Sequence, residues 1–341
     1  MRVAVDAFNL VADRRGMGRY ARTILTDFRE RADLAITLLV RDPSHVPILQ
    51  NEFGCAVETA RAARTRRFDA VWYPWNGVRF ELPAPKMVTV HDAFAFTHPA
   101  GDPIARWRER RPIRRALRIA DRLATVSHWS ANELAHACAV DASRFSIIAP
   151  VPDPFWQPMP AQPVLRPYVL FVGGPDERKN AVTLFGAFER AFPDGDVTLV
   201  VAGTLRDADE ATLRDSNIVH DRVRPDDEHL RELYQHAYAV AIPSVAEGYG
   251  IMAVEAMACG AAVIAADAAA LPESCDGAAL LVPPLDRDAW SAALRRVIED
   301  DALRADLRRR SLARAARIDR DAPANQTLRL LRELGASTGS G

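Results

Sequence analysis

Residues 239–265 read AVAIPSVAEGYGIMAVEAMACGAAVIA. The apolar runs 239–242 and 262–265 predict short strands buried on both faces, and residues 251–259 between them predict a helix. A helix that connects two neighbouring strands of one sheet makes those strands parallel. This stretch therefore predicts an α/β fold built on a doubly wound parallel sheet.

The same alternation of strands and helices continues on both sides of this stretch. Further strands are expected at residues 2–5, 36–40, 70–73, 87–90, 122–126, 146–149, 168–172 and 197–202. Prolines crowd residues 150–167, which excludes a helix or a central strand there and predicts a linker. A chain of 341 residues is long enough for two domains. We expect them at residues 1–152 and 165–320.

The charge of the chain is balanced overall but unevenly distributed. The formal net charge is −1, yet residues 1–150 carry 23 basic and 16 acidic residues, whereas residues 151–341 carry 21 and 29. This balance excludes a globally basic nucleic-acid-binding protein, so no nucleic-acid partner is expected. Lys86 and Lys179 are the two lysines among 44 basic residues. A lysine kept in so arginine-rich a chain suggests a need for its compact head group.

The cysteines and the N-terminus favour a cytoplasmic protein. The cysteines have no CxxC spacing and no histidine pattern beside them, which predicts buried thiols in a reducing compartment: Cys55, Cys138, Cys259 and Cys275. Residues 1–6 lack the apolar core of a signal peptide. No apolar run approaches the roughly 18 residues that a membrane span needs.

Ligands of doubly wound sheets bind where strands end at their carboxyl edge, and two candidate groups of the first half lie there. Residues 15–20 (RGMGRY) follow the first strand, and their glycines and the helix start suit an anion. His91 and Asp92 follow the strand at 87–90. A tight turn and a structural pair at a strand end explain these two patterns about as well.

Two candidate groups of the second half follow strands in the same way. Residues 173–180 (GGPDERKN) place two glycines before adjacent cations and a helix start, which suits a diphosphate. In residues 244–260, Glu247 lies in a glycine loop and Glu255 in the next helix, where both could bind hydroxyl groups. The alternatives are a capping turn with surface charges and acids that complement a helix dipole.

An arginine-rich segment spans residues 106–122. Its spacing places one set on a single predicted helix face: Arg111, Arg114, Arg115, Arg118 and Arg122. This face could contact anionic lipid headgroups, or a lipid-linked phosphate, at the inner face of the cytoplasmic membrane. A solvated face in an arginine-rich protein explains the pattern as well, and both interpretations stay open.

Taken together, these segments resemble the GT-B glycosyltransferases of family 4, the retaining enzymes of group 1. The likeness extends over about residues 1–335 and depends most on Glu247, Glu255 and the residues up to Gly260. The glycine loop at 16–20 and Ala270-Leu271 before Pro272-Glu273 are similar to bacterial polysaccharide mannosyltransferases. The resemblance implies two Rossmann-like domains that face each other across a cleft. It also implies a last helix, at about 322–335, that crosses back to the first domain.

The resemblance implies a role for each candidate residue. Arg178 and Lys179 would bind the pyrophosphate of a nucleotide sugar, and Glu255 its ribose. Glu247 would bind donor-sugar hydroxyls, and His91 would lie beside that sugar; together with Arg178 and Lys179 they form the expected catalytic set. The other donor-binding positions would be Gly16, Met17, Gly18, Gly173, Gly174, Gly248, Tyr249, Gly250 and Ile251.

The implied reaction is transfer of a hexose, with mannose favoured, in bacterial surface polysaccharide or lipopolysaccharide synthesis. A GDP- or UDP-linked sugar would be the donor, and a glycan or lipid-linked molecule the acceptor. No metal or cofactor is expected, because cations and helix N-termini would neutralise the leaving diphosphate. Asp207-Ala208-Asp209 is predicted to be a solvated loop and not a metal site. A nucleotide-sugar epimerase of this fold and a non-catalytic nucleotide- or glycan-binding protein remain alternatives.

Overall fold

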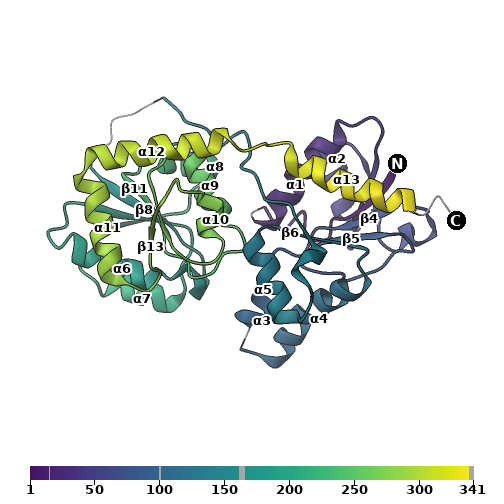
Figure 1. Ribbon diagram of the computed structural model, residues 1–341, viewed down its shortest axis with the longest axis horizontal. Coiled ribbons are helices and arrows are strands. Elements are labelled where there is room, and N and C mark those ends of the chain that lie inside the picture. The colour runs from purple at the N-terminus through teal and green to yellow at the C-terminus, as the bar shows by residue number, and fades with distance from the viewer. Residues whose placement is uncertain (15, 100, 161–165, 338–341) are drawn as a thin grey trace. The chain divides into compact units, whose positions relative to one another are not determined.

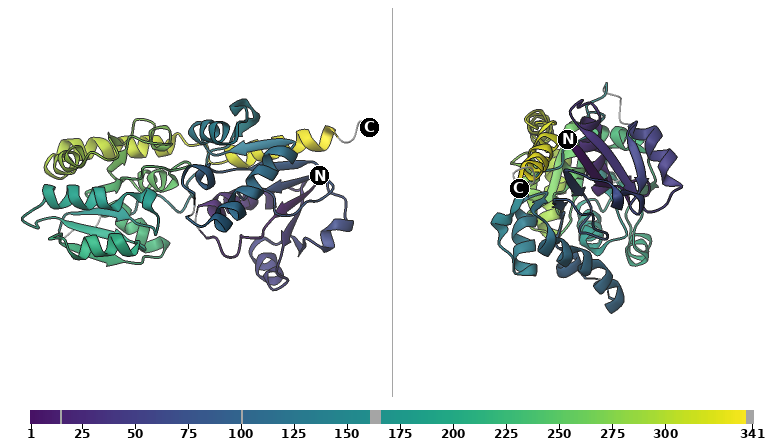
Figure 2. Two further views of the ribbon diagram at one scale, coloured as in Figure 1. Left: turned by 90° about the horizontal axis from the view of Figure 1, so that it is seen from below. Right: turned by 90° about the vertical axis from the view of Figure 1, so that its right-hand side faces the viewer.

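A computed structural model of the chain describes residues 1–14, 16–99, 101–160 and 166–337. The chain divides into two compact units. The N-terminal unit consists of residues 1–151 and 319–341, and the C-terminal unit of residues 152–318. Each unit is built on its own sheet, and Figures 1 and 2 show helices on both faces of each sheet.

The N-terminal unit has a seven-stranded parallel sheet in the order β3-β2-β1-β4-β5-β6-β7. Its strands are β1 (Arg2–Asp6), β2 (Ala35–Val40), β3 (Ala56–Thr59), β4 (Ala70–Tyr73), β5 (Lys86–Thr89), β6 (Arg122–Thr125) and β7 (Phe145–Ile147). The strand order reverses between β1 and β4, which creates a switch point at the carboxyl edge.

Both faces of this sheet are covered because successive strand residues point to opposite sides. Its helices are α1 (Met17–Arg29), α2 (His45–Phe53), α3 (Phe94–Thr97), α4 (Pro103–Ile119), α5 (His128–Cys138) and α13 (Ala322–Ser337). Trp72 packs against Tyr20 and Phe28 of α1, whereas the next residue, Tyr73, shares a core with Ile113 of α4. The C-terminal helix α13, yellow in Figure 1, contacts α1, β4 and β5.

The C-terminal unit has a six-stranded parallel sheet in the order β10-β9-β8-β11-β12-β13. Its strands are β8 (Tyr168–Val172), β9 (Thr198–Ala202), β10 (His220–Val223), β11 (Ala239–Ile242), β12 (Val263–Ala266) and β13 (Leu280–Val282). Its helices are α6 (Ala181–Ala191), α7 (Asp207–Arg214), α8 (Asp227–His236), α9 (Ile251–Ala258), α10 (Leu271–Cys275), α11 (Arg287–Glu299) and α12 (Asp301–Ala316). The two doubly wound parallel sheets confirm the predicted fold class.

Part of the proline-rich segment predicted as a linker belongs to the core of the C-terminal unit. Trp156 is fully buried and packs edge-on against Tyr234, with ring centroids 5.7 Å apart. The Gln235 side chain donates a hydrogen bond of 2.5 Å to the carbonyl of Met159. Prolines exclude regular structure from this segment but do not prevent it from packing. Residues 161–165, which were part of the predicted linker, lie outside the described residues.

Two expectations about charged segments were wrong. Asp207-Ala208-Asp209 begins α7 instead of forming a solvated loop, and Asp209 is buried where it accepts hydrogen bonds of 2.9 and 2.8 Å from Arg206. Arg122 lies at the start of β6, in agreement with the strand expected at 122–126, and not on the arginine-rich helix, which ends at Ile119. Helical spacing alone could not show that α4 stops before Asp121.

The packing of the proline-rich segment predicts a large effect for Trp156→Ala. Loss of this buried ring should lower the free energy of unfolding of the C-terminal unit by about 3–5 kcal/mol, because a cavity remains in the core. Chemical denaturation followed by circular dichroism measures the change. Trp107→Ala is the control, since Trp107 is exposed on α4 and its loss should be nearly neutral. Equal stability of the two variants would contradict the packing described.

Candidate active site

Two predicted residues of the C-terminal unit form an ion pair at the carboxyl edge of its sheet. Lys179 follows β8 in a short 3₁₀ turn, and Glu247 follows β11. Lys179 Nζ lies 2.7 Å from Glu247 Oε1, and their side chains are 20% and 16% exposed. β8 and β11 are neighbours in the sheet, so the loops that follow them end up side by side. The prediction that these residues share a site is consistent with this geometry.

The glycines around this pair keep the site narrow and the backbone accessible. A Cβ on Gly174 would lie 3.8 Å from carbons of Lys179, and Gly173 packs closely against the loop after β9. Gly250 adopts a φ of +85°, and a Cβ there would lie 2.7 Å from Leu271. Gly250 caps the start of α9, whose first residue is Ile251. Backbone N–H groups and the positive end of the helix dipole are therefore presented beside Glu247.

The Tyr249 side chain helps to hold the glycine loop in place. Tyr249 is buried, and burial raises the pKa of its hydroxyl, although the positive charge of Arg314 in α12 acts against this rise. Arg314 also donates a hydrogen bond of 3.2 Å to the carbonyl of Ser274 in α10. The predicted contribution of Tyr249 to the site thus comes from its backbone, because its side chain is used for packing.

Arg178 is held by an acidic neighbour in this structure. Its Nε lies 3.0 Å from both carboxylate oxygens of Asp176, and its carbonyl accepts a hydrogen bond of 2.8 Å from Val245 N–H. Burial alone would raise the pKa of Asp176, but the hydrogen bonds from Arg178 outweigh it and hold that pKa below its usual value. A diphosphate would have to compete with Asp176 for this guanidinium. The same holds for Lys179, whose ammonium is paired with Glu247.

Glu255 lies deeper than its predicted role suggests. It belongs to α9, and the residue is only 3% exposed. A ribose could contact so little surface only if neighbouring groups move. The role of Glu255 toward a ribose stays a prediction.

In the N-terminal unit the glycine loop and His91 come together. Gly16 caps α1 with φ +50°, and Gly18 passes so close to Asp13 that a Cβ would lie 1.9 Å from its carbonyl oxygen. The ring of Tyr20, two residues further, meets His91 edge-on at 5.0 Å between centroids. Met17 is the first residue of α1. These residues gather at the carboxyl ends of β1 and β5.

His91 is a neutral hydrogen-bond acceptor at physiological pH. Its Nε2 lies 2.8 Å from the carbonyl oxygen of Pro74, which can only accept, so Nε2 carries the hydrogen. Burial lowers the pKa of His91 to about 4. The ring therefore keeps a lone pair on Nδ1, which suits a hydroxyl donor.

Asp6 is a buried carboxyl group of this edge that the sequence did not single out. It ends β1, accepts a hydrogen bond of 3.0 Å from Phe8 N–H, and its carbonyl accepts one of 2.7 Å from Trp75 Nε1. Burial raises the pKa of Asp6 to about 7, although Arg79 and Arg41 act against this rise. An acid directly after the first apolar strand was the available signal.

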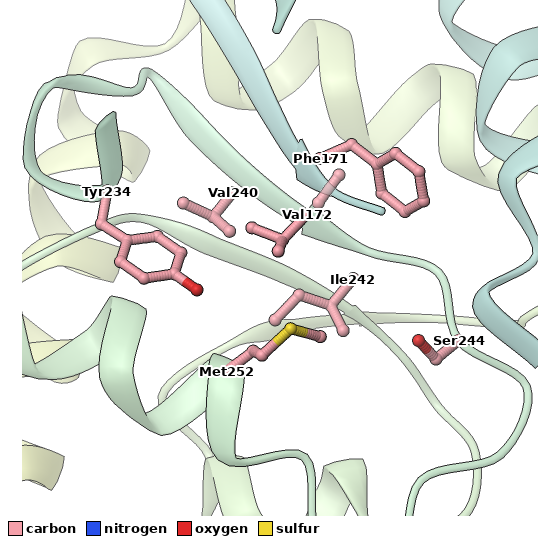
Figure 3. A pocket seen from close by; sticks show the side chains of 8 residues that line it. Phe171, Val172, Tyr234, Val240, Ile242, Ser244 and Met252 are labelled. Carbon is pink, nitrogen blue, oxygen red and sulfur yellow. The ribbon is translucent and has the colours of Figure 1, made fainter. Parts of the chain in front are cut away.

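A small cavity lies behind the glycine loop of the C-terminal unit. Figure 3 shows that its lining is largely apolar: Phe171, Val172, Tyr234, Val240, Ala241, Ile242, Ser244 and Met252. Its volume of about 10 Å³ is close to that of a single water molecule. The Ser244 hydroxyl is buried there and has no hydrogen-bond partner among the described residues. This cavity is too small to hold a nucleotide or a sugar.

The arginines of α4 are not equivalent. Arg111, Arg114 and Arg118 are exposed, whereas Arg115 is paired with Glu81 at 2.7 Å. Glu81 therefore partly neutralises Arg115, and the role of the four arginines toward an acceptor or a membrane stays a prediction. Ile104 and Trp107 at the start of α4 are 62% and 57% exposed, and the Arg111 guanidinium lies 5.0 Å from the Trp107 ring centre.

Metal-binding clusters and membrane-spanning helices are both absent from the described ranges. Within them, no cluster of three or more His, Cys, Asp or Glu side chains has the arrangement of a metal site. None of the helices in the described part of the chain has the length and apolar character that a membrane crossing requires.

Asp6 and His91 should give opposite pH dependences of stability. The pKa of His91 falls on folding from 6.5 to about 4. The contribution of the neutral ring to the free energy of unfolding is therefore complete above pH 6.5 and is lost as the pH falls toward 4. The pKa of Asp6 rises from 3.8 to about 7, so its contribution is complete below pH 3.8 and is lost as the pH rises toward 7. Each shift corresponds to about 3–4 kcal/mol.

Urea unfolding of His91→Asn and Asp6→Asn between pH 4 and 7 tests this pair. Relative to the unsubstituted protein, His91→Asn should gain stability as the pH falls, and Asp6→Asn should gain stability as the pH rises. Differences of the same sign in both variants would show that the assigned shifts are wrong.

Comparison with known proteins supports the geometry of both units. Residues 14–154 match the family described as Glycosyltransferase Family 4, and residues 166–300 match Glycosyl transferases group 1. The O-antigen chain mannosyltransferase B of Escherichia coli is 29% identical over 75% of this chain and 73% of its own length. The O-antigen chain mannosyltransferase RfbU of Salmonella typhimurium is 26% identical over 83% of this chain and 87% of its own length.

A solved structure shows the same fold over nearly the whole chain. Anabaena HepE in complex with UDP-glucose superposes with a TM-score of 0.77 at 17% identity, over 98% of this chain and all of HepE. The family matches cover the larger part of both units and include the Lys179–Glu247 pair and His91. The chain therefore belongs to the group 1, family 4 glycosyltransferases of GT-B fold.

Proposed function

We propose that this glycosyltransferase moves a hexose from a nucleotide-diphosphate sugar to a glycan or lipid-linked acceptor in bacterial surface polysaccharide synthesis. Mannose is the hexose that we favour. The observation that carries the proposal is the Lys179–Glu247 pair between glycine-rich strand ends. Mannose is supported by the names of the two O-antigen mannosyltransferase relatives. The nucleotide is GDP or UDP, and UDP-glucose binding by HepE supports a nucleotide sugar as donor.

In the proposed reaction the C-terminal unit binds the leaving diphosphate. Lys179 offers a compact positive charge, Arg178 a second one once it exchanges Asp176 for phosphate, and the start of α9 adds its backbone N–H groups. Glu247 is then free to accept hydrogen bonds from hydroxyls of the donor sugar. In the N-terminal unit, Nδ1 of His91 would accept a hydrogen bond from a substrate hydroxyl group.

Charge neutralisation by these groups would make the transfer independent of a metal ion. Breaking the bond between the anomeric carbon and phosphate oxygen leaves a diphosphate whose added negative charge needs nearby positive charge. We propose retention of configuration: the acceptor hydroxyl attacks from the side of the leaving group, and the leaving phosphate oxygen takes its proton. No further carboxylate is required as a base. The carboxylates of Asp209 and Asp176 are already occupied by arginines.

Binding and transfer assays test the proposed function. Thermal unfolding in the presence of GDP, UDP, GDP-mannose and UDP-glucose should show a raised midpoint with at least one nucleotide, because a ligand of the folded state stabilises it. Lys179→Ala should remove this shift. It should also lower transfer of labelled hexose to bacterial membrane glycans by about 10²-fold or more, the effect of removing one group that stabilises developing charge. Wild-type transfer by a folded Lys179→Ala variant would contradict the assignment.

The same assay separates the alternative functions. An epimerase would change the free nucleotide sugar without an acceptor, and a binding protein would show the thermal shift with no turnover.

After exhaustive chelation, transfer should continue at an unchanged rate. Recovery of transfer only upon addition of Mg²⁺ or Mn²⁺ would show that the proposed charge neutralisation is incomplete.

We also propose that α4 contacts an anionic membrane surface, which would bring the enzyme to a lipid-linked acceptor. The exposed Ile104 and Trp107 lie one helical turn apart, next to the exposed Arg111. Apolar side chains beside free arginines are typical of helices that lie in the interface of a membrane.

Vesicle co-sedimentation tests this contact. Binding to vesicles with phosphatidylglycerol should exceed binding to neutral vesicles, and the variant with alanine at Arg111, Arg114 and Arg118 should lose most of it. The matched control replaces three other exposed arginines of the same unit, Arg61, Arg64 and Arg67. Equal binding of all proteins to both kinds of vesicle would refute the contact.

A further inference from the structure

Asn180 occupies a special backbone position directly after Lys179. Its φ of +54° lies in the left-handed region, where it closes the 3₁₀ turn Glu177–Lys179 and caps the start of α6. Glycine and asparagine tolerate this conformation best, and most other residues are strained in it. The backbone alone would therefore accept glycine, and the reason for an asparagine must lie in its side chain.

The Asn180 side chain joins three loops of the C-terminal unit. Its Nδ2 donates to the carbonyl of Pro243 at 3.0 Å and to the carbonyl of Pro284 at 2.7 Å. Its Oδ1 accepts a hydrogen bond of 2.7 Å from Thr183 Oγ1. Both hydrogens of the amide are thus used, and its carbonyl is fixed from α6.

These carbonyls belong to the loops that follow other strands of the sheet. Pro243 comes directly after β11 and begins the loop that carries Glu247, and Pro284 follows β13 and precedes α11. A backbone hydrogen bond of 2.8 Å from Val245 N–H to the Arg178 carbonyl is a second link between the first two loops. The Lys179–Glu247 pair lies between these connections, one residue from Asn180 and four residues from Pro243.

We infer that Asn180 is a positioning residue that sets the placement of Lys179 and Glu247 before a nucleotide sugar binds. The inference rests on the proposed function of that pair. The two hydrogen bonds from one rigid amide fix the loops after β11 and β13 against the turn after β8. Without them, the loops that carry Lys179 and Glu247 would be joined mainly by the Val245–Arg178 backbone hydrogen bond and by the ion pair itself. That ion pair must open when a diphosphate binds, so the cation would then be poorly placed.

Asn180→Gly separates the backbone from the side chain. Glycine keeps the left-handed turn and removes the amide, so the protein should fold while the two carbonyls lose their donor. The chain offers a direct readout, because Lys179 and Lys86 are its two lysines. Lys86 lies in the N-terminal unit, 3.3 Å from Glu81, and serves as the internal reference. Acetylation of both by limiting acetic anhydride, quantified by mass spectrometry, reports how firmly Lys179 is held.

In Asn180→Gly, the ratio of Lys179 to Lys86 acetylation should rise about tenfold. The dissociation constant for GDP or UDP should rise by a similar factor. Changes of this size are expected when hydrogen bonds that hold a charged group are lost. Asn180→Asp should show the same changes, because its carboxylate faces the two carbonyls without a donor. Asn217→Gly, which removes an asparagine hydrogen-bonded to Glu189 before β10, should leave both quantities unchanged.

An unchanged acetylation ratio in a folded Asn180→Gly variant would overturn the inference. That ratio is measured without nucleotide, so it is independent of the proposed reaction. If neither GDP nor UDP protects Lys179 of the unsubstituted protein, the proposed function fails instead. An increase of Lys179 acetylation in Asn180→Gly would still support the positioning role in that case.

Discussion

Parallel strand pairing is the constraint on which the rest of this structure depends. Each parallel sheet places the carboxyl ends of all its strands along one edge. Residues that directly follow different strands can therefore meet there even when they are far apart in the chain. Lys179 and Glu247 are separated by 68 positions but form an ion pair, because β8 and β11 are neighbours. In the N-terminal unit, the glycine loop after β1 and His91 after β5 meet through Tyr20.

The cations of the candidate site are neutralised by carboxylates of the same chain. Lys179 is paired with Glu247 and Arg178 with Asp176, so the site carries little uncompensated charge before a ligand arrives. A diphosphate would replace one carboxylate at each cation and release Glu247 toward sugar hydroxyls. Such an exchange discriminates between ligands, since a phosphate without a sugar gives Glu247 no new partner. The compact ammonium of Lys179 suits this exchange better than a guanidinium fixed in a bidentate contact.

The sequence was sufficient for the fold class and for the central strands. Apolar runs such as 239–242 identify central strands directly, whereas the edge strand β10 reads HDRV and shows no apolar pattern. The partners of charged groups could not be predicted, because they depend on which loops meet in space. Examples are the ion pairs of Arg115 with Glu81, of Arg206 with Asp209 and of Arg178 with Asp176. The buried Asp6 was also missed, although it ends the first apolar strand.

The loop that carries Glu247 is held from two sides. Asn180 fixes its beginning through the Pro243 carbonyl, and near its end the Tyr249 side chain is buried close to the positive charge of Arg314 in α12. The chain leaves the C-terminal unit only a few residues after Arg314, before α13 joins the N-terminal unit. A displacement of Arg314 would change the electrostatic surroundings of Tyr249 in the loop that carries Glu247. Because Gly250 cannot accept a Cβ beside Leu271, the loop has little freedom to absorb such a change locally. The loop that carries Glu247 is therefore constrained at its beginning by Asn180 and near its end by Gly250.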